Sequence, residues 1–322
     1  MKLIHYNGSK LEYRDKIIYK PAFNLMLPQN QLNFSFVSEL TNAPFVLDAD
    51  PTKVTGWVQD YIDSDKKAIT FEGTDTLYLV GHGLVVNNYL ALSGNLPSGL
   101  SRKIYVVHTV VDANRIKLKE VGSSSIITFS GLYTDCYIHL NPAVETTLAN
   151  KPGLNQKSSG HIGIKGLLST SKLTFRSKAV KTVYAVFKNN QPLNSLAVLA
   201  TDQTINNYFI FAARQPSGTT YGLYETGSGQ PATTWNNFIQ GYIITNGVKS
   251  NTPVLNTFYT QAGVENISGF FSNNSSSSLN CLLGIGASYM ELYALIGYGD
   301  LHNSYTASLI MSMLQQKYAI NY

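Results

Sequence analysis

Cysteine is nearly absent from this sequence: only Cys136 and Cys281 occur in 322 residues. A disulfide framework needs several cysteines, so this count excludes a small cross-linked scaffold. We predict that both cysteines are buried free thiols, with a single bridge between the two halves of the chain as the alternative. Apolar runs are also short. No segment reaches the roughly 18 consecutive apolar residues of a membrane-spanning helix, so no membrane span is expected.

Charged residues are scarce. They make up 13% of the chain, which is about half the usual share for a soluble domain. The formal net charge is +5, but the Lys and Arg residues are scattered and form no cluster typical of a nucleic-acid surface. We therefore expect no nucleic-acid partner. The polar surface must come mainly from Ser, Thr, Asn, Gln and Tyr.

The residue patterns of common catalytic and metal sites are missing. The six histidines show no H-x-x-x-H spacing, and no G-x-S-x-G or phosphate-loop motif occurs. A glycosidase needs two carboxylates that flank the scissile bond. The 19 acidic residues are dispersed, however, and Glu291 stands alone on its predicted strand. Asp202 with Asn206 and Asn207 offers too few oxygen ligands for calcium. The sequence thus predicts no catalytic residue, no metal ligand and no cofactor.

The abundant residues favour β-structure. Tyr (21 residues) is a strand former, and Gly (25 residues) supplies turns. Short apolar runs recur about every 8–12 residues between turn signals, which is typical of an antiparallel barrel or sandwich. We predict an all-β chain with an N-terminal arm or docking segment over residues 1–44 and a small β-barrel or sandwich module over 45–145. A linker rich in chain breakers follows over 146–172, and then a β-sandwich over 173–322.

Short sequence signals predict individual turns, a strand and the N-terminal end of a helix. Asn7-Gly8 and Asn246-Gly247 predict hairpin turns, and residues 126–129 predict a strand. Ser304 is the candidate N-cap of the one predicted helix, whose largely apolar face is expected to pack on the sandwich. That face consists of Thr306, Leu309, Ile310, Met313, Leu314, Lys317 and Tyr318. Two glycines flank His82 at a strand exit, so this histidine is expected to be a turn residue with a satisfied imidazole.

Four short pieces of the first half occur in a fixed order within residues 81–118. They are Gly81-His82-Gly83-Leu84, Leu96-Pro97-Ser98-Gly99-Leu100, Tyr105-Val106-Val107 and Ala113-Asn114-Arg115-Ile116-Lys117-Leu118. In this order they resemble a small β-module that is repeated in phage tail and fibre proteins.

Three passages of the second half also follow one another in a recognisable order. They are the strand-like run 182–187, Leu283-Gly284-Ile285-Gly286, and the run 291–298 that leads into a helix ending in Lys317-Tyr318-Ala319-Ile320. This order resembles the concanavalin-A-like, laminin-G-like jelly roll of many phage structural proteins. The resemblance implies a jelly-roll β-sandwich with one C-terminal helix.

Together the resemblances imply a non-enzymatic structural protein of a bacteriophage virion: a head fibre, capsid decoration, vertex spike or tail fibre. Its N-terminal part would bind other virion proteins. Its lectin-like domain would face outward for host attachment, with a cell-surface glycan as ligand. Such proteins form symmetric homo-oligomers, among which a trimer is favoured.

The expected location follows from the same resemblances. The first residues lack the apolar segment of a secretion signal, so we expect the protein in the virion, assembled in the host cytoplasm. Two alternatives remain: a major or minor capsid protein built from two jelly rolls, and a polysaccharide depolymerase.

Several segments of the second half have the composition of a sugar-binding surface, in which aromatic side chains accompany amides. The candidate ligand-binding residues are Asn206, Asn207, Tyr208, Tyr221, Tyr224, Trp235 and Asn236. In the alternative interpretation the tyrosines are ordinary sandwich residues and the asparagines are turn formers. Trp57 and Trp235 are expected to fit a core better than a binding platform.

Overall fold

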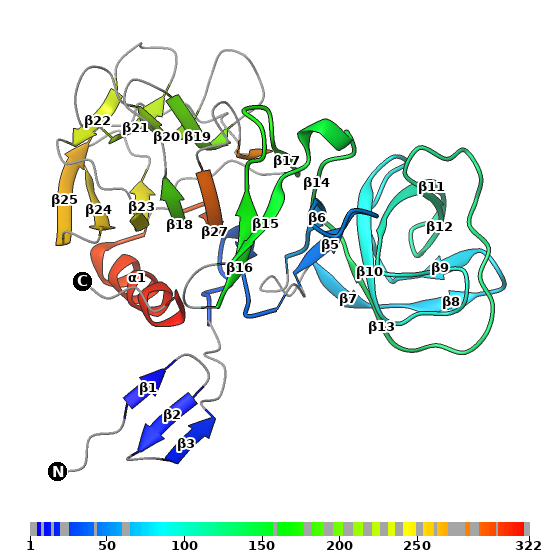
Figure 1. Ribbon diagram of the computed structural model, residues 1–322. Helices are drawn as coiled ribbons and strands as arrows, with labels where there is room; N and C mark the ends of the chain where they lie inside the picture. The colour runs from blue at the N-terminus through cyan, green and yellow to red at the C-terminus, as the bar shows by residue number, and fades with distance from the viewer. Residues whose placement is uncertain are drawn as a thin grey trace.

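The computed structural model describes residues 5–7, 10–13, 16–19, 26–41, 44–59, 65–156, 160–176, 182–189, 196–201, 209–214, 221–225, 231–235, 241–248, 254–260, 263–269, 281–283, 290–300 and 302–318. Within these ranges the chain consists of antiparallel β-sheets, a short 3-10 turn η1 (Leu148–Asn150) and one α-helix near the C-terminus, which confirms the all-β class (Figure 1). A barrel and a two-sheet sandwich form the two large bodies.

The barrel is a seven-stranded antiparallel sheet that closes on itself. Its strands are β7 (Lys66–Ala68), β8 (Thr70–Glu72), β9 (Thr76–Tyr78), β10 (Tyr89–Asn95), β11 (Ile104–Asp112), β12 (Arg115–Glu120) and β13 (Thr134–His139). β7 and β8 are parts of one segment interrupted at Ile69; β7 pairs with β13, whereas β8 pairs with β9. Because both ends of the strand order meet in this segment, the sheet has no long free edge. Buried side chains such as Leu77, Leu90 and Ile116 give the barrel its own core.

Two further sheets form the sandwich. The first contains β5 (Phe45–Leu47), β6 (Val54–Trp57), β14 (Ala143–Val144), β17 (Leu173–Thr174), β19 (Leu196–Thr201), β20 (Phe209–Arg214), β21 (Tyr221–Glu225), β22 (Pro231–Trp235) and β26 (Cys281–Leu282). The second contains β4 (Leu32–Val37), β15 (Gly153–Gln156), β16 (Ile162–Lys165), β18 (Thr182–Asn189), β23 (Gly241–Val248), β24 (Val254–Thr260), β25 (Gly263–Gly269) and β27 (Met290–Tyr298). Side chains from both sheets meet in one core, where the Trp57 ring lies 4.9 Å from Phe45 and 5.9 Å from Phe36 between ring centroids.

The barrel is inserted into the sandwich. The chain enters the barrel after β6 and leaves it before β14, and these two strands pair with Trp57 opposite Ala143. Beyond the pair, the Gln59 side chain donates a hydrogen bond of 2.6 Å to the Asn141 carbonyl. The entry and exit of the barrel therefore lie side by side, as Figure 1 shows at β6 and β14.

The strand pairing differs from the boundaries predicted from composition. β4 falls in the predicted arm (1–44) but pairs with β27, and β15 and β16 fall in the predicted linker (146–172) but extend the same sheet. β5 and β6 precede the barrel yet belong to the sandwich. Breaker residues mark the gaps between strands, but they carry no information about which distant strands will pair.

Two hairpin predictions have opposite outcomes. β1 (His5–Asn7), β2 (Lys10–Tyr13) and β3 (Lys16–Tyr19) form a separate sheet in which Asn7 pairs with Lys10, which confirms the first hairpin. The second is wrong, because Asn246 lies inside β23, opposite Tyr184 of β18. A full-length partner strand there overrides the local preference of Asn-Gly for a turn. The predicted strand at 126–129 is wrong too: Ile126 makes only an isolated bridge to Lys119.

The helix α1 (Ser304–Tyr318) covers the outer face of the sheet that contains β27, β18 and β4, opposite the sandwich core. This packing confirms the prediction for the helix. Its buried residues are Ile310, Met311, Leu314, Lys317 and Tyr318. The predicted face is wrong at Leu309, which is 46% exposed, because the helix is rotated so that Met311 is buried instead.

The N-cap of α1 is Asn303 rather than Ser304. The Asn303 side-chain oxygen accepts a 2.9 Å hydrogen bond from the Thr306 N–H, and the Asn303 carbonyl accepts from Ala307 N–H at 3.0 Å. Because the Asn303 carbonyl accepts the first hydrogen bond of the helix, the prediction of Ser304 is wrong by one residue.

We expect Asn303→Ala to lower the free energy of unfolding by about 1 kcal/mol, because it removes the acceptor for a helix N–H. Ser308→Ala is the matched control: this exposed serine lies inside the helix, so its effect should stay within about 0.5 kcal/mol. Urea denaturation followed by circular dichroism measures both. Equal effects of the two substitutions would argue against a capping role for Asn303.

Two predictions about buried residues are confirmed. Cys136 and Cys281 are buried thiols that form no disulfide, and burial raises the pKa of the Cys136 thiol. Trp57 is fully buried in the sandwich core, so it is a core residue.

Candidate functional site

The predicted ligand-binding residues are only partly described by the structure. Asn206, Asn207, Tyr208 and Asn236 lie outside the described residues. Tyr221 and Tyr224 belong to β21, and Trp235 is the last residue of β22, the outermost strand of its sheet. The register brings Tyr221 and Trp235 to opposite positions of these strands, whereas Tyr224 is opposite Pro231. Two of the seven predicted residues are thus neighbours in the sheet.

The pieces that resemble a fibre module hold one another in the barrel. His82 is buried; its Nδ1 accepts a hydrogen bond from Leu84 N–H at 2.9 Å, so its Nε2 carries the proton and donates to the Asp112 carbonyl at 3.0 Å. The Gly81 N–H donates to the Asn114 side chain at 2.8 Å. Both glycines beside His82 have positive φ, which favours glycine. The prediction of a turn histidine with a satisfied imidazole is confirmed.

The turn between the second and third pieces is also hydrogen-bonded to the third piece. Tyr105 is buried, and its hydroxyl accepts a hydrogen bond from the Ser101 N–H and donates to the Ser101 carbonyl, both at 2.9 Å. Gly99 has φ +95°, and a Cβ there would lie 2.4 Å from the Thr128 carbonyl oxygen. The turn before β11 therefore requires glycine at position 99. Two hydrogen bonds to Tyr105 connect this turn to β11.

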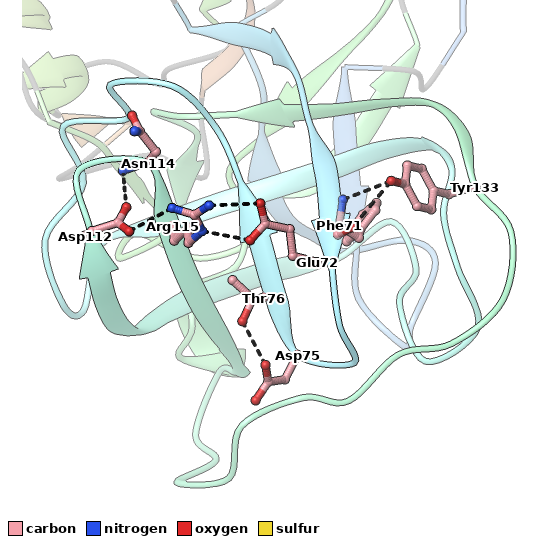
Figure 2. A network of polar contacts seen from close by, with 8 residues as sticks. All are labelled: Phe71, Glu72, Asp75, Thr76, Asp112, Asn114, Arg115 and Tyr133. Atoms are coloured by element: carbon pink, nitrogen blue, oxygen red, sulfur yellow. Dashed lines mark hydrogen bonds and ion pairs between the residues drawn. The ribbon is translucent and has the colours of Figure 1, made fainter.

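A polar network on the barrel surface ties β8 and β11 to β12 (Figure 2). Arg115 donates to both carboxylate oxygens of Glu72, at 2.7 and 3.2 Å, and to Asp112 at 3.0 Å. The N–H of Asn114 and then Arg115 hold the pKa of Asp112 below its usual value. All three charged side chains are substantially exposed, and exposed pairs contribute little stability. The network therefore serves mainly to orient these strands.

A hollow of about 370 Å³ lies at the junction of the barrel with the sandwich, and we call it the junction groove. The sandwich side contributes Val46, Leu47, Asp48, Ala49, Thr55, Thr146 and Lys151, and the barrel side contributes Lys103, Ile104, Glu120 and Val121. Val46 and Ile104 also belong to the small apolar cluster that joins the two bodies. The groove therefore has an apolar floor where the barrel meets the sandwich.

Two ion pairs occupy the walls of the junction groove. On the sandwich wall, Lys151 Nζ lies 2.9 Å from Asp48 Oδ2, and Lys151 is only 8% exposed. The hydrogen bond from Lys151 is the main cause that lowers the pKa of Asp48. On the barrel wall, Lys103 Nζ lies 3.2 Å from Glu120 Oε1, and both side chains are more than half exposed. The four charges cancel, so the groove offers both donors and acceptors without net charge.

We expect Asp48→Asn to destabilise the protein by about 2 kcal/mol at neutral pH, because the buried Lys151 ammonium loses its counter-charge. The folded-state pKa of Asp48 is lowered, so its contribution is complete above the unfolded value of about 3.9 and is lost as pH falls through the lower folded value. The difference between wild type and variant should therefore be constant above about pH 5 and shrink below about pH 4.

Urea denaturation across this pH range measures the Asp48 effect. Glu120→Gln is the control in the same groove: it breaks an exposed pair and should change stability by less than about 1 kcal/mol. A difference between wild type and Asp48→Asn that grows on acidification would contradict the assignment.

The groove residues could not be selected from the sequence. Asp48, Lys103, Glu120 and Lys151 come from four separate segments and match no motif. They meet only because the barrel is inserted between β6 and β14, and that pairing has no local signal.

Comparison with protein-family models, with curated proteins and with solved structures gave no match. Across the described ranges, no three His, Cys, Asp or Glu side chains gather where they could hold a metal ion. Among the helical segments that the structure describes, none combines the length and apolar character that a bilayer crossing needs.

Proposed function

We propose that this chain is a structural protein of a bacteriophage virion that displays its C-terminal sandwich for attachment to the host surface. The observation that carries the proposal is the set of hydrogen bonds that connect the pieces resembling the fibre module with one another and with the turns beside them. The piece at Gly81–Leu84 is bonded to the turn at Asp112–Asn114. The turn ahead of β11 is bonded to Tyr105. These bonds hold the pieces together in one barrel, which supports the proposal of a fibre-like module.

The architecture is also suited to display. A closed barrel presents no long strand edge, so many copies can stand close together without pairing edge to edge. The separate sheet β1–β3 offers a segment for contact with other virion proteins. The inserted body is a barrel rather than a second two-sheet sandwich, which favours this proposal over a capsid protein built from two jelly rolls.

Attachment is tested by competition. Full-length protein, added to host cells before the phage whose genome encodes it, should reduce phage adsorption. Tyr221→Ala and Trp235→Ala should weaken this effect, whereas Tyr305→Ala, at a tyrosine of α1 that is 76% exposed, should not. Undiminished adsorption at saturating protein would overturn the attachment role. Breakdown of surface polysaccharide by the pure protein would instead favour a depolymerase.

The oligomeric state is tested separately. Light scattering of the purified 35.4 kDa chain should give the mass of a homotrimer, the state that we favour for a display protein. A monomer at micromolar concentration would contradict the proposed trimer without affecting the attachment experiment.

A further inference from the structure

We propose that the junction groove is a binding site for a neutral saccharide unit. This inference rests on the attachment role proposed above, but it places a ligand site between the barrel and the sandwich, away from the aromatic residues of β21 and β22. Three properties of the groove support it: balanced charge, an apolar floor and a buried, fixed ammonium group.

The charges of the walls favour hydroxyl groups as ligands. A lysine ammonium only donates hydrogen bonds and a carboxylate only accepts them. A sugar hydroxyl does both, so neighbouring hydroxyls can accept a hydrogen bond from Lys103 and donate one to Glu120. The hydroxyls of Thr55 and Thr146, which also line the groove, can pair in either direction. A ligand with net charge would meet one like and one opposite charge on each wall, so it gains no net attraction to offset the loss of its hydration, which disfavours acidic and basic sugars.

The floor and the size fit a short saccharide. Val46, Ile104 and Val121 line the groove with apolar surface, and the C–H face of a sugar ring can cover such surface. The volume of about 370 Å³ is near the lower end of the roughly 300–1,000 Å³ that small-ligand sites occupy. The groove therefore suits one or two sugar rings.

The sandwich wall is already ordered for binding. Lys151 is nearly buried and Asp48 holds its ammonium at 2.9 Å, so little side-chain entropy is lost when a ligand arrives. Asp48 takes one of the three ammonium donors. The second oxygen of Asp48 accepts the Ala49 N–H at 2.7 Å, which fixes the carboxylate as well.

Saturation-transfer difference NMR on the full chain tests the site. The probes are the methyl glycosides of glucose, galactose and mannose together with N-acetylglucosamine, and the charged comparisons are glucuronic acid and glucosamine. We expect transfer to at least one neutral probe and weaker transfer to its charged counterpart. No transfer to any neutral probe, with a protein that melts cooperatively, would overturn the proposal.

Two matched substitutions locate the binding. Val121→Trp should fill the mouth of the groove and abolish transfer. Val111→Trp, at another exposed valine of the barrel, should leave it unchanged. Lys103→Met should weaken binding about 3- to 10-fold, because one charge-assisted hydrogen bond is lost at an exposed position.

The outcomes separate this inference from the proposed function. If Val121→Trp binds a neutral sugar as well as wild type does, the groove is not the site, although attachment through sugars can still hold. If the sugars bind in the groove but the protein does not compete with phage adsorption, the site stands and the attachment role falls.

Discussion

A fragment of residues 173–322, the sandwich as predicted from composition, is expected not to fold. The fragment lacks β4 and β16, which pair with β27, and it also lacks β5, β6 and β14 of the opposite sheet. It loses the core aromatics Phe34, Phe36, Phe45 and Trp57. Each such loss costs about 3–5 kcal/mol, and together they exceed the roughly 5–15 kcal/mol by which a domain is stable.

The matched control for this fragment is a variant without the barrel. Replacing residues 60–140 with a short Gly-Ser loop should leave a folded sandwich, because Gln59 and Asn141 are already in hydrogen-bond contact and β6 pairs with β14. Circular dichroism and the dispersion of amide NMR signals measure both proteins. A fragment 173–322 that melts cooperatively would contradict the insertion of the barrel into the sandwich.

Gly94→Ala is expected to destabilise the barrel by about 3–5 kcal/mol, the largest effect that we predict for a single substitution. Gly94 lies in a β-bulge of β10 with φ +99°, and a Cβ there would lie 2.0 Å from the carbonyl oxygen of Asp135. Since this neighbour is backbone, no rotamer change can relieve the clash. The strand pair β10–β13 must separate locally to accept any side chain.

Gly131→Ala is the control for Gly94. Its φ of +96° is nearly the same, but a Cβ there would meet no atom within 4 Å. Only the backbone strain remains, which costs about 1–2 kcal/mol. Urea denaturation of the full chain compares the two variants. Equal losses would show that strain alone matters and that the bulge accommodates a methyl group.

Sequence patterns predicted the local structure better than the long-range structure. The hairpin at Asn7, the turn at His82 and the terminal helix depend on neighbours in the chain, and their signals were correct. Asn246 gave the same kind of signal but lies within β23, because its pairing with β18 outweighs local preference. No local sequence signal in either segment predicts that β4 pairs with β27. The domain boundaries therefore could not be predicted from composition.

The candidate site shows the same limit. Composition selected Tyr221 and Trp235, and the register places them opposite each other. It could not select Lys151, whose significance comes from burial beside Asp48 at the junction groove. From the sequence alone, an isolated lysine is expected at the solvent-exposed surface. Only the strands that cover Lys151 show that it is buried.

The most direct test of the proposed virion assignment is quantitative mass spectrometry of gradient-purified particles of the phage that, under this proposal, encodes the chain. We expect peptides of the protein in a fixed ratio to the major capsid protein, at a copy number divisible by three, with the ratio unchanged through a second purification. Absence of these peptides from infectious particles, or a ratio that falls with each purification step, would contradict a structural role in the virion.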